Sequence, residues 1–325
     1  PLVGLIDPFN GLEDIKKKIL RTVGNPKDRF AEDALRILRA VRFQAVLGFS
    51  IDFDTKAEMR AQRENLLKIS KERICAETNK MFEGVYLSKA INNFKDIMIP
   101  IIPEFKDMVG FNQHNPYHKY DVWLHTYHTI KSCPLDRITR LAALFHDIGK
   151  PHCFQQEEVN GELRFHFKGH AEKSVEITEE ILKDLRFSNK DIEEILLLIK
   201  YHDVTFSPTK KFIRKMLTKM SREDLKRLIT LRVADVLGQG LADMRDDRIV
   251  RAFDTFELLM HFDDEEECFS LKQLAIDGND LKEIGMKPGP QMGKVLNTLL
   301  EMVIQEEIEN EKEVLLDFVT NKWKE

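Results

Sequence analysis

The sequence predicts a mainly α-helical protein, and three observations lead to this fold class. From Gly11 onward, hydrophobic residues recur every three or four positions almost throughout, which is the spacing of helices with one buried face. Glycine, proline, asparagine and serine interrupt this pattern and indicate the breaks between helices. One segment, residues 153–167, has the pattern of a β-hairpin, with two short runs flanking Asn160-Gly161. A chain of 325 residues is long enough for two or three domains.

The helices are expected in the following order. Asn25-Pro26 begins and Gly48 ends a single helix, and two more follow at 53–70 and 70–84. The loop-rich segment 101–121 indicates a domain boundary. The later helical and loop segments are 122–150, then 170–261 with loops near Ser188 and Ser207, an acidic solvated loop at 263–267, and a long helix that ends the segment 274–304.

The turn before that last helix contains Gly289, Gly293 and Lys294. We interpret it as structural, because its prolines set the direction in which the helix starts. Phosphate binding by the amides of the helix start is the alternative.

Composition and cysteine usage exclude several classes of protein. The chain is 42% hydrophobic and 32% charged, and it has no apolar run near the roughly 18 residues of a membrane span, so we expect no membrane partner. Its cysteines form no CxxC pair, which argues against a disulfide framework and a zinc knuckle. They are Cys75, Cys133, Cys153 and Cys268. This pattern fits a reducing compartment, and we expect a cytoplasmic protein.

Charge is distributed unevenly along the chain. Residues 1–100 carry 18 Lys and Arg against 14 Asp and Glu, although the whole chain has a net charge of −5. A polyanion should therefore bind to the first hundred residues. The chain begins with the apolar run PLVGLI, which we interpret as the end of a strand whose sheet lies upstream. A processed or engineered start is the alternative.

Adjacent residues His146 and Asp147 suggest a metal site. They occupy the apolar segment LAALFHDIGKP, which is expected to be helical, so one ion can bind both only with help from other helices. His125 and Asp235 are the candidates, and this mixed nitrogen and oxygen set suits Mn, Fe, Ni, Co or Zn. Lys150 would offset charge developing on a phosphate, and a solvated lysine is the alternative. Ion pairs of Asp147 with Lys150 and of Asp235 with Arg232 are the alternative to metal binding.

A row of charged residues, Asp33, Arg36, Arg39 and Arg42, runs beside a buried helix face. The predicted buried residues are Ala34, Ile37, Leu38, Val41 and Ala45. A carboxylate next to a guanidinium complements the edge of cytosine or adenine, so Asp33 and Arg36 could read a base while Arg39 and Arg42 bind phosphates or stack. Ion pairs along the helix, including Glu32–Arg36 and Arg29–Asp33, are the alternative.

The pattern His125, His146-Asp147, Asp235 resembles the HD phosphohydrolase superfamily, in which these four positions bind the metal. The resemblance implies that His146, Asp147 and Lys150 are catalytic and that the metal is Mn, Ni, Co or Mg. His170 and His202 fall where two-metal members have further histidines; buried, hydrogen-bonded histidines or surface histidines are the alternative. Five others are expected in loops or on the surface: His114, His118, His128, His152 and His166.

Residues 6–49 closely resemble class II tRNA nucleotidyltransferases, the family of CCA-adding enzymes and poly(A) polymerases. The hinge motif of that family appears as Asp7, Gly11 and Asp14, and its nucleobase-selecting EDxxR motif as Glu32, Asp33 and Arg36. Residues 66–82 resemble the neck helix, and residues 278–296 resemble the C-terminal segment of members that carry an HD domain.

This resemblance implies four regions. They are a remnant of the nucleotidyltransferase head at 1–25, a multi-helical neck with RNA- and nucleobase-binding helices at 26–100, an HD-type domain with a small β-hairpin at 101–245, and a helical C-terminal tail at 246–325. The implied nucleotide-binding residues are Glu32, Asp33, Arg36, Arg39 and Arg42. The implied partners are the tRNA 3′ end, ATP and CTP.

The catalytic magnesium carboxylates of the family, a DxD motif, and its Gly-Gly and Arg-Asp motifs are not matched and are expected upstream of residues 4–9. This chain alone should therefore not transfer nucleotides. Two alternatives stay open: an independent HD phosphohydrolase that holds nucleotides or RNA, and a non-catalytic RNA-binding protein.

Overall fold

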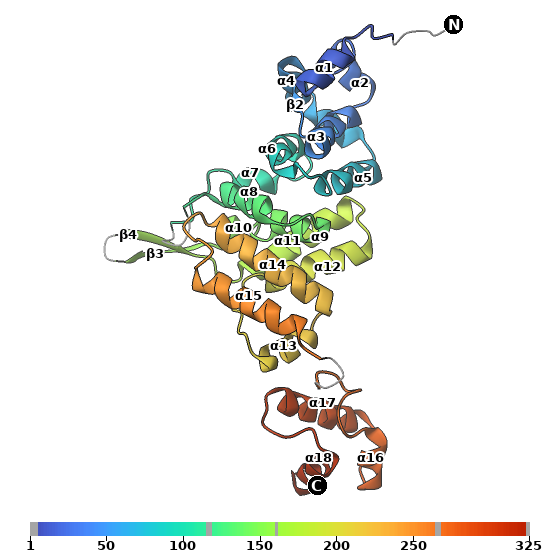
Figure 1. The fold of residues 1–325 in the computed structure, drawn as a ribbon, viewed down its shortest axis with the longest axis vertical. Helices are drawn as coiled ribbons and strands as arrows, with labels where there is room; N and C mark the ends of the chain where they lie inside the picture. Colours follow the sequence, from blue (N-terminus) through green and yellow to red (C-terminus); the bar gives the residue numbers. More distant parts are fainter. Residues whose placement is uncertain (1–5, 115–118, 160–161, 264–267, 323–325) are drawn as a thin grey trace. The chain divides into compact units, whose positions relative to one another are not determined.

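The computed structural model describes residues 6–114, 119–159, 162–263 and 268–322, which are mainly helical as the sequence predicts (Figure 1). The chain divides into two compact units. Unit 1 comprises residues 1–204 and 230–246, and unit 2 comprises residues 205–229 and 247–325. Unit 1 thus keeps the predicted neck and much of the predicted HD region together. No helix in the described ranges is both long and apolar enough to cross a membrane.

The first hundred residues of unit 1 pack around α3 (Leu35–Leu47), which contacts α5 (Lys71–Phe82) and α6 (Leu87–Met98). All five residues of the predicted buried face are buried, so that prediction is confirmed. The other elements here are α1 (Gly11–Lys17), β1 (Ile19–Leu20), α2 (Pro26–Glu32), β2 (Ser50–Ile51), α4 (Phe53–Ala61) and the 3-10 helix η1 (Arg63–Lys68). The parallel pairing of β1 with β2 was not predicted, because two-residue strands show no alternation.

The predicted single helix between Asn25 and Gly48 is wrong. The chain leaves helical geometry at Asp33, where φ is −150° and ψ is 100°. The carboxylate of Asp33 accepts a hydrogen bond from the amide of Leu35, two residues on. A short acidic side chain that binds a nearby amide in this way competes with helix continuation. Asp33 therefore separates α2 from α3, and its side chain is not part of a continuous helical row.

The second part of unit 1 is built around α9 (Arg137–Phe145), whose residues 138–145 are all buried. It packs against α8 (Val122–Ser132) and α12 (Asn189–Tyr201). Aspartates start two of these helices, since Asp121 accepts from the amide of Leu124 and Asp136 from that of Thr139. The remaining helices are α7 (Glu104–Met108), α10 (Lys150–Cys153), α11 (His170–Asp184) and the last part of α14 (Arg222–Gly238).

The predicted hairpin is confirmed. Strands β3 (Gln155–Val159) and β4 (Glu162–His166) pair antiparallel, with Gln155 opposite His166. The residues of its predicted turn, Asn160 and Gly161, lie outside the described residues. Most of the acidic loop predicted at 263–267 lies outside them too.

Unit 2 contains α13 (Lys210–Leu217), the first part of α14, α15 (Asp247–Met260), α16 (Gly278–Glu283), α17 (Pro290–Ile304) and α18 (Lys312–Lys322). Leu281, Val295, Leu299 and Leu315 are among the residues of its core. α17 begins at Pro290 with Gly289 as its N-cap, which agrees with the structural interpretation of this turn.

Candidate metal centre and nucleotide-binding helix

The four predicted metal ligands come together inside unit 1. His125 lies in α8, Asp235 in α14, and His146 with Asp147 in the turn between α9 and α10. The Nε2 atoms of His125 and His146 are 3.1 Å apart. His125 Nε2 lies 3.2 Å from Asp147 Oδ2 and 3.0 Å from Asp235 Oδ1, and His146 Nε2 lies 3.3 Å and 3.6 Å from the same atoms. We call these residues the first ligand set.

The expectation that His146 and Asp147 lie inside a helix is wrong, because α9 ends at Phe145. The turn that follows lets two adjacent side chains face one point, which a continuous helix prevents. The turn also brings Gly149 against α11, where an added Cβ would lie 2.6 Å from the amide nitrogen of Ser174. The sequence pattern therefore identified the residues but not their backbone.

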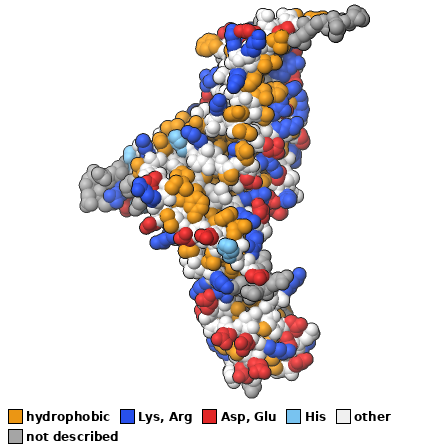
Figure 2. All heavy atoms as spheres, viewed as in Figure 1, with side chains coloured by type: hydrophobic (Ala, Val, Ile, Leu, Met, Phe, Trp, Pro, Cys, Tyr) orange, Lys and Arg blue, Asp and Glu red, His pale blue; other side chains and the backbone are white. Residues whose placement is uncertain are grey.

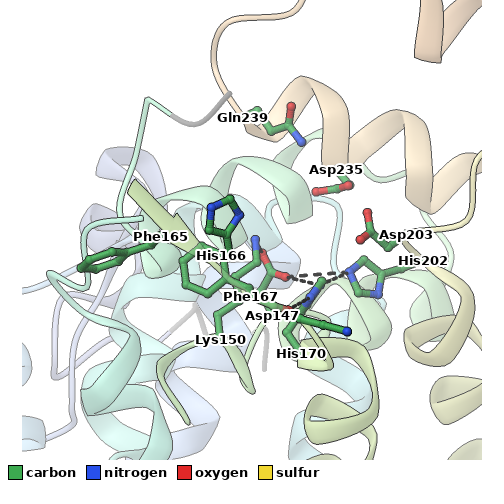
Figure 3. Close-up of a pocket in the computed structure, with 11 residues that line it drawn as sticks. Asp147, Lys150, Phe165, His166, Phe167, His170, His202, Asp203, Asp235 and Gln239 are labelled. Atoms are coloured by element: carbon green, nitrogen blue, oxygen red, sulfur yellow. Dashed lines mark hydrogen bonds and ion pairs between the residues drawn. The ribbon is translucent and has the colours of Figure 1, made fainter. Parts of the chain in front are cut away.

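Asp147 also faces a second group of histidines. The Nε2 atoms of His170 and His202 are 3.1 Å apart, and they lie 3.6 Å and 3.8 Å from Asp147 Oδ1. We call Asp147, His170 and His202 the second ligand set. Since Asp147 presents Oδ2 to the first set and Oδ1 to the second, its carboxylate bridges the two (Figure 3).

Backbone carbonyls fix the orientation of three histidine rings. The Nδ1 atoms of His146, His170 and His202 lie 2.8, 2.8 and 2.7 Å from the carbonyl oxygens of the residues three positions earlier. A carbonyl only accepts hydrogen bonds, so each Nδ1 carries a proton and donates it. This arrangement directs each Nε2 atom to its ligand set, as in histidines that bind metals.

The donor atoms fit a divalent cation. Two ligands that lie 2.1 Å from an ion and 90° apart are about 3.0 Å from one another, and tetrahedral ligands about 3.4 Å. The distances within the first ligand set fall between 3.0 and 3.6 Å. Two buried carboxylates in one place are costly unless a cation compensates them. Imidazole with carboxylate suits Mn, Fe, Co, Ni or Zn.

The electrostatics describe what compensates the carboxylates in the absence of an ion. Burial disfavours a charge on His146, but Asp147 and Asp235 raise its pKa to about 10. Burial and the nearby His146 lower the pKa of His202 to about 4. The pKa of Asp147 lies well below its ordinary value despite burial, because of His146 and Lys150. A proton on His146 therefore takes the place that a metal cation would have.

The two ion pairs considered as alternatives to metal binding are both present. Lys150 Nζ lies 2.7 Å from Asp147 Oδ2, and Arg232 Nη1 lies 3.0 Å from Asp235 Oδ2. The Arg232 pair leaves Asp235 Oδ1 facing the histidines, so it orients the carboxylate. Lys150 is buried, which excludes the solvated lysine, and it also donates to Gln113 Oε1 at 2.9 Å.

A pocket of about 350 Å³ opens beside the two ligand sets. Besides ligands and Lys150 it is lined by Phe165, His166, Phe167, Lys168, Asp203 and Gln239 (Figure 3). Sequence analysis did not select Gln113, Asp203, Gln239 or the aromatic residues. The hairpin pattern was the available signal for Phe165 and Phe167, since it placed them a few residues from His170.

The other histidines are placed as follows. His114, His152 and His166 are exposed, although His166 borders the pocket, and His118 lies outside the described residues. His128 belongs to α8 and stacks on Tyr120 with the ring centres 4.3 Å apart.

The predicted base-reading residues lie at the junction of α2 and α3. Arg36 donates to Glu32 at 2.7 Å, and Arg73 donates to Asp33 at 2.9 Å. The Glu32–Arg36 pair considered as an alternative is therefore present, whereas Arg29 pairs with Glu32 and not with Asp33. The side chains of Asp33 and Arg36 are 28% and 39% exposed, so both are accessible to a ligand.

Arg39 and Arg42 lie in different surroundings. Arg36 and Arg39 line a second pocket of about 350 Å³, together with Arg21, Phe30 and Phe43 among others. Arg42 does not line it, and its Nε lies 3.1 Å from Glu77 Oε2 with only 15% of the side chain exposed. The structure therefore separates Arg42 from the predicted phosphate-binding row.

A surface suited to a polyanion lies in the same region. In the view of Figure 2, Lys and Arg side chains lie among hydrophobic ones over the part of unit 1 labelled α1 to α6 in Figure 1. The hydrophobic residues exposed there include Phe9, Phe43 and Phe53. Basic groups mixed with aromatic rings are typical of surfaces that bind single-stranded nucleic acid.

The hinge-like residues have local structural roles. Asp7 accepts from the amides of Gly11 and Leu12 at the start of α1, and Asp14 pairs with Arg21. The sequence Asp52-Phe53-Asp54 has the DxD form that sequence analysis did not find. Asp52 caps α4 through the amide of Thr55 and pairs with Arg21 at 2.9 Å, so it acts as a helix cap.

Known families and proteins match most of the chain. The family described as tRNA nucleotidyltransferase domain 2 putative matches residues 166–319, and that described as probable RNA and SrmB-binding site of polymerase A matches residues 48–108. A CCA-adding enzyme of Pediococcus pentosaceus is 30% identical over 99% of this chain and 68% of its own length. An A-adding tRNA nucleotidyltransferase of Deinococcus radiodurans is 26% identical over 91% and 70%.

Solved structures share the fold. The structure of Bacillus stearothermophilus CCA-adding enzyme in complex with CTP has a TM-score of 0.66 at 24% identity and covers 98% of this chain and 69% of that one. Thermotoga maritima CCA-adding enzyme, complexed with a tRNA, has a TM-score of 0.53 at 16% identity, over 97% and 67%. The chain thus spans about two thirds of the length of these relatives.

Proposed function

Because this chain belongs to the tRNA nucleotidyltransferase family that includes the CCA-adding enzymes, we propose that it forms the part of such an enzyme that holds tRNA and selects the nucleotide. The observation that carries the proposal is the match of 99% of the chain to a CCA-adding enzyme. The whole enzyme would transfer CMP and AMP from CTP and ATP to the tRNA 3′ end, with magnesium supplied to the reaction.

The geometry of α2 and α3 supports a role in nucleotide selection. Asp33 offers a carboxylate and Arg36 a guanidinium within one short segment, and both remain partly exposed. An acceptor beside forked donors complements the base edge of cytosine or adenine. Arg39 lines the same pocket as Arg36 and would bind the phosphates.

The test is incorporation of labelled CMP and AMP into tRNA that lacks its 3′ end. We expect incorporation when this chain is joined to a nucleotidyltransferase head, and none from the 325-residue chain alone. The physical reason is that Asp52, the first carboxylate of its DxD sequence, is engaged in a helix cap. Magnesium-dependent incorporation by the chain alone would show that the transfer site lies within it.

A second function, metal-dependent phosphate ester hydrolysis, is supported by the bridging of the two ligand sets by Asp147. A bound divalent metal would supply an activated water and polarise a phosphoryl oxygen. His125, His146, Asp147 and Asp235 would hold one ion, and Asp147, His170 and His202 a second. Lys150, held by Asp147 and Gln113, would place a positive charge beside the phosphate.

Metal analysis and hydrolysis of 4-nitrophenyl phosphate and bis(4-nitrophenyl) phosphate test this activity. We expect hydrolysis with Mn, Ni or Co to exceed that with Mg, because imidazole ligands favour these metals. If the reconstituted chain neither retains a transition metal nor hydrolyses either ester, the hydrolase proposal is wrong, whereas the proposal on nucleotide selection is unaffected.

A further inference from the structure

An aromatic cluster lies beside the metal centre and has no role in the chemistry described above. Phe111, Phe154, Phe165 and Phe167, which we call the aromatic wall, contact one another with ring centres 5.1 to 6.4 Å apart. Phe165 and Phe167 come from the end of the hairpin and line the pocket. In Figure 3, Phe167 lies between Phe165 and Asp147.

The aromatic wall is only partly buried. Phe154 is 42% exposed, and Phe165 and Phe167 are intermediate, in contrast to the fully covered rings of the main core. A cluster that served only to hold the hairpin would be expected to bury its rings on all sides. Here two rings instead border a pocket that also contains the cationic groups of Lys150 and Lys168.

Contacts through one short segment fix the aromatic wall relative to the metal centre. The carbonyl of His114 accepts from the amide of Phe165 at 3.1 Å, and its ring lies 4.6 Å from that of Phe165. The neighbouring Gln113 is buried and accepts from Lys150 Nζ. The same segment therefore positions both the rings and the lysine that faces Asp147.

From this arrangement we infer that the pocket selects phosphate esters that carry a nucleobase, with Phe165 and Phe167 as the stacking residues. The inference rests on the proposed hydrolase function, in which the ligand sets hold the phosphate. A pocket of about 350 Å³ suits one nucleotide unit and not a duplex. Stacking of a base on an aromatic side chain changes affinity by about five- to 150-fold and tolerates every base. The nucleotide is either free or the last residue of an RNA strand.

Binding of 2-aminopurine riboside 5′-monophosphate to the full chain tests the inference directly, because stacking quenches the fluorescence of this base. We expect quenching that AMP reverses by competition, whereas base-free ribose 5-phosphate competes at least fivefold more weakly. The same titration with a trinucleotide that ends in 2-aminopurine distinguishes the terminal residue of RNA from a free nucleotide.

Leucine variants separate stacking from hairpin structure. Phe165→Leu and Phe167→Leu retain an apolar side chain but lose the ring face, so each should weaken binding of the fluorescent nucleotide at least fivefold and leave metal content unchanged. Phe154→Leu, in the same wall but not on the pocket, is the matched control and should bind as the parent does.

Equal competition by AMP and ribose 5-phosphate, or unchanged quenching in both pocket variants, would overturn the inference. An equal loss in Phe154→Leu would also overturn it, since the wall would then act only through the hairpin. Failure of the hydrolase proposal has a different signature, namely no hydrolysis of either nitrophenyl ester by the metal-loaded chain.

Discussion

At the residue scale, Asp147 is the centre of the candidate metal site. Its two oxygens face different pairs of histidines, and Lys150 adds a third contact at 2.7 Å. The carbonyl acceptors behind His146, His170 and His202 determine which nitrogen of each ring faces inward. The site is therefore arranged for cations before any ion binds.

Substitution of single ligands should change the number of ions bound. Asp147→Ala removes the bridge and should abolish metal retention and hydrolysis, while tRNA binding persists. His170→Ala affects only the second ligand set, so the chain should retain one ion where the parent retains two. Elemental analysis of the reconstituted proteins measures this number. His166→Ala, at the pocket but in neither ligand set, is the control, and an equal loss of metal in it would contradict the assignment.

Asp33 and Arg36 should determine base preference in the complete enzyme. Asp33→Ala and Arg36→Ala each remove one half of the pattern that faces the base, so they should reduce discrimination between CTP or ATP and the other nucleotides by about ten- to a hundredfold. Arg39→Ala should weaken the use of all nucleotides about equally. The measurement is kcat/KM for each nucleotide on tRNA that lacks its 3′ end.

The structure supplies a control for this experiment. Arg42 pairs with Glu77 away from the pocket, so Arg42→Ala should affect stability more than nucleotide use. Full CTP and ATP preference in Asp33→Ala would show that the base is selected elsewhere.

At the element scale, the close approach of the α9–α10 turn to α11 determines the metal geometry. Gly149 donates from its amide to Ser174 Oγ at 3.0 Å, and it leaves no room for a side chain against the backbone of His170 and Ser174. Two ligand-bearing segments, one with Asp147 and one with His170, therefore depend on a single glycine. The reason is steric and does not involve a positive φ, since φ at Gly149 is −79°.

Gly149→Ala should separate these two segments. An added Cβ would lie 2.6 Å from the amide nitrogen of Ser174 and 2.8 Å from the carbonyl oxygen of His170. We expect a loss of about 1–3 kcal/mol in the free energy of unfolding and weaker metal retention. Denaturant unfolding and elemental analysis measure the two effects. Gly293→Ala, in the helix α17 with open space around it, should instead be neutral or stabilising by up to about 1 kcal/mol.

At the scale of the whole molecule, one ion pair ties the first hundred residues of unit 1 to the helices of the metal centre. Arg137 at the start of α9 donates to Asn79 in α5 at 2.6 Å and to both oxygens of Asp191 in α12 at 3.1 and 2.7 Å. Burial raises the pKa of Asp191, but the bonds from Arg137 outweigh it and hold that pKa below its ordinary value. Such a two-point contact is stronger than a typical surface pair.

Asp191→Asn should therefore destabilise the protein in a pH-dependent way. Because the folded-state pKa lies below the unfolded value of about 3.9, the stabilisation is complete above that value and is lost as pH falls through the folded-state pKa. We expect the variant to lose about 1–3 kcal/mol of unfolding free energy at pH 7. The difference from the parent should be constant above about pH 5 and narrow below about pH 4.

Urea unfolding at a series of pH values checks this dependence. The exposed Asp184, which pairs with Lys71 across the surface, provides the control variant Asp184→Asn with an expected change below about 0.5 kcal/mol. A loss in Asp191→Asn that grew as pH fell would contradict the argument.

The sequence by itself determined the helical class, the hairpin, the buried face of α3 and the identity of the first ligand set. These features follow from local periodicity and from residue types whose chemistry does not depend on context. It could not show the break at Asp33, because helix propensity and a side-chain hydrogen bond compete there within a few tenths of a kcal/mol to about 1 kcal/mol. It also could not separate Arg42 from Arg36 and Arg39.

Only the tertiary structure decided which polar groups share one cavity. His170 and His202 were equally compatible with buried, hydrogen-bonded or surface histidines in the sequence, and their approach to Asp147 Oδ1 depends on how α11 and α12 pack against α9. Gln113, Phe165 and Phe167 likewise reach the pocket through long-range contacts. Packing brings together residues that are distant along the chain, and a single sequence carries no local pattern that specifies these distances.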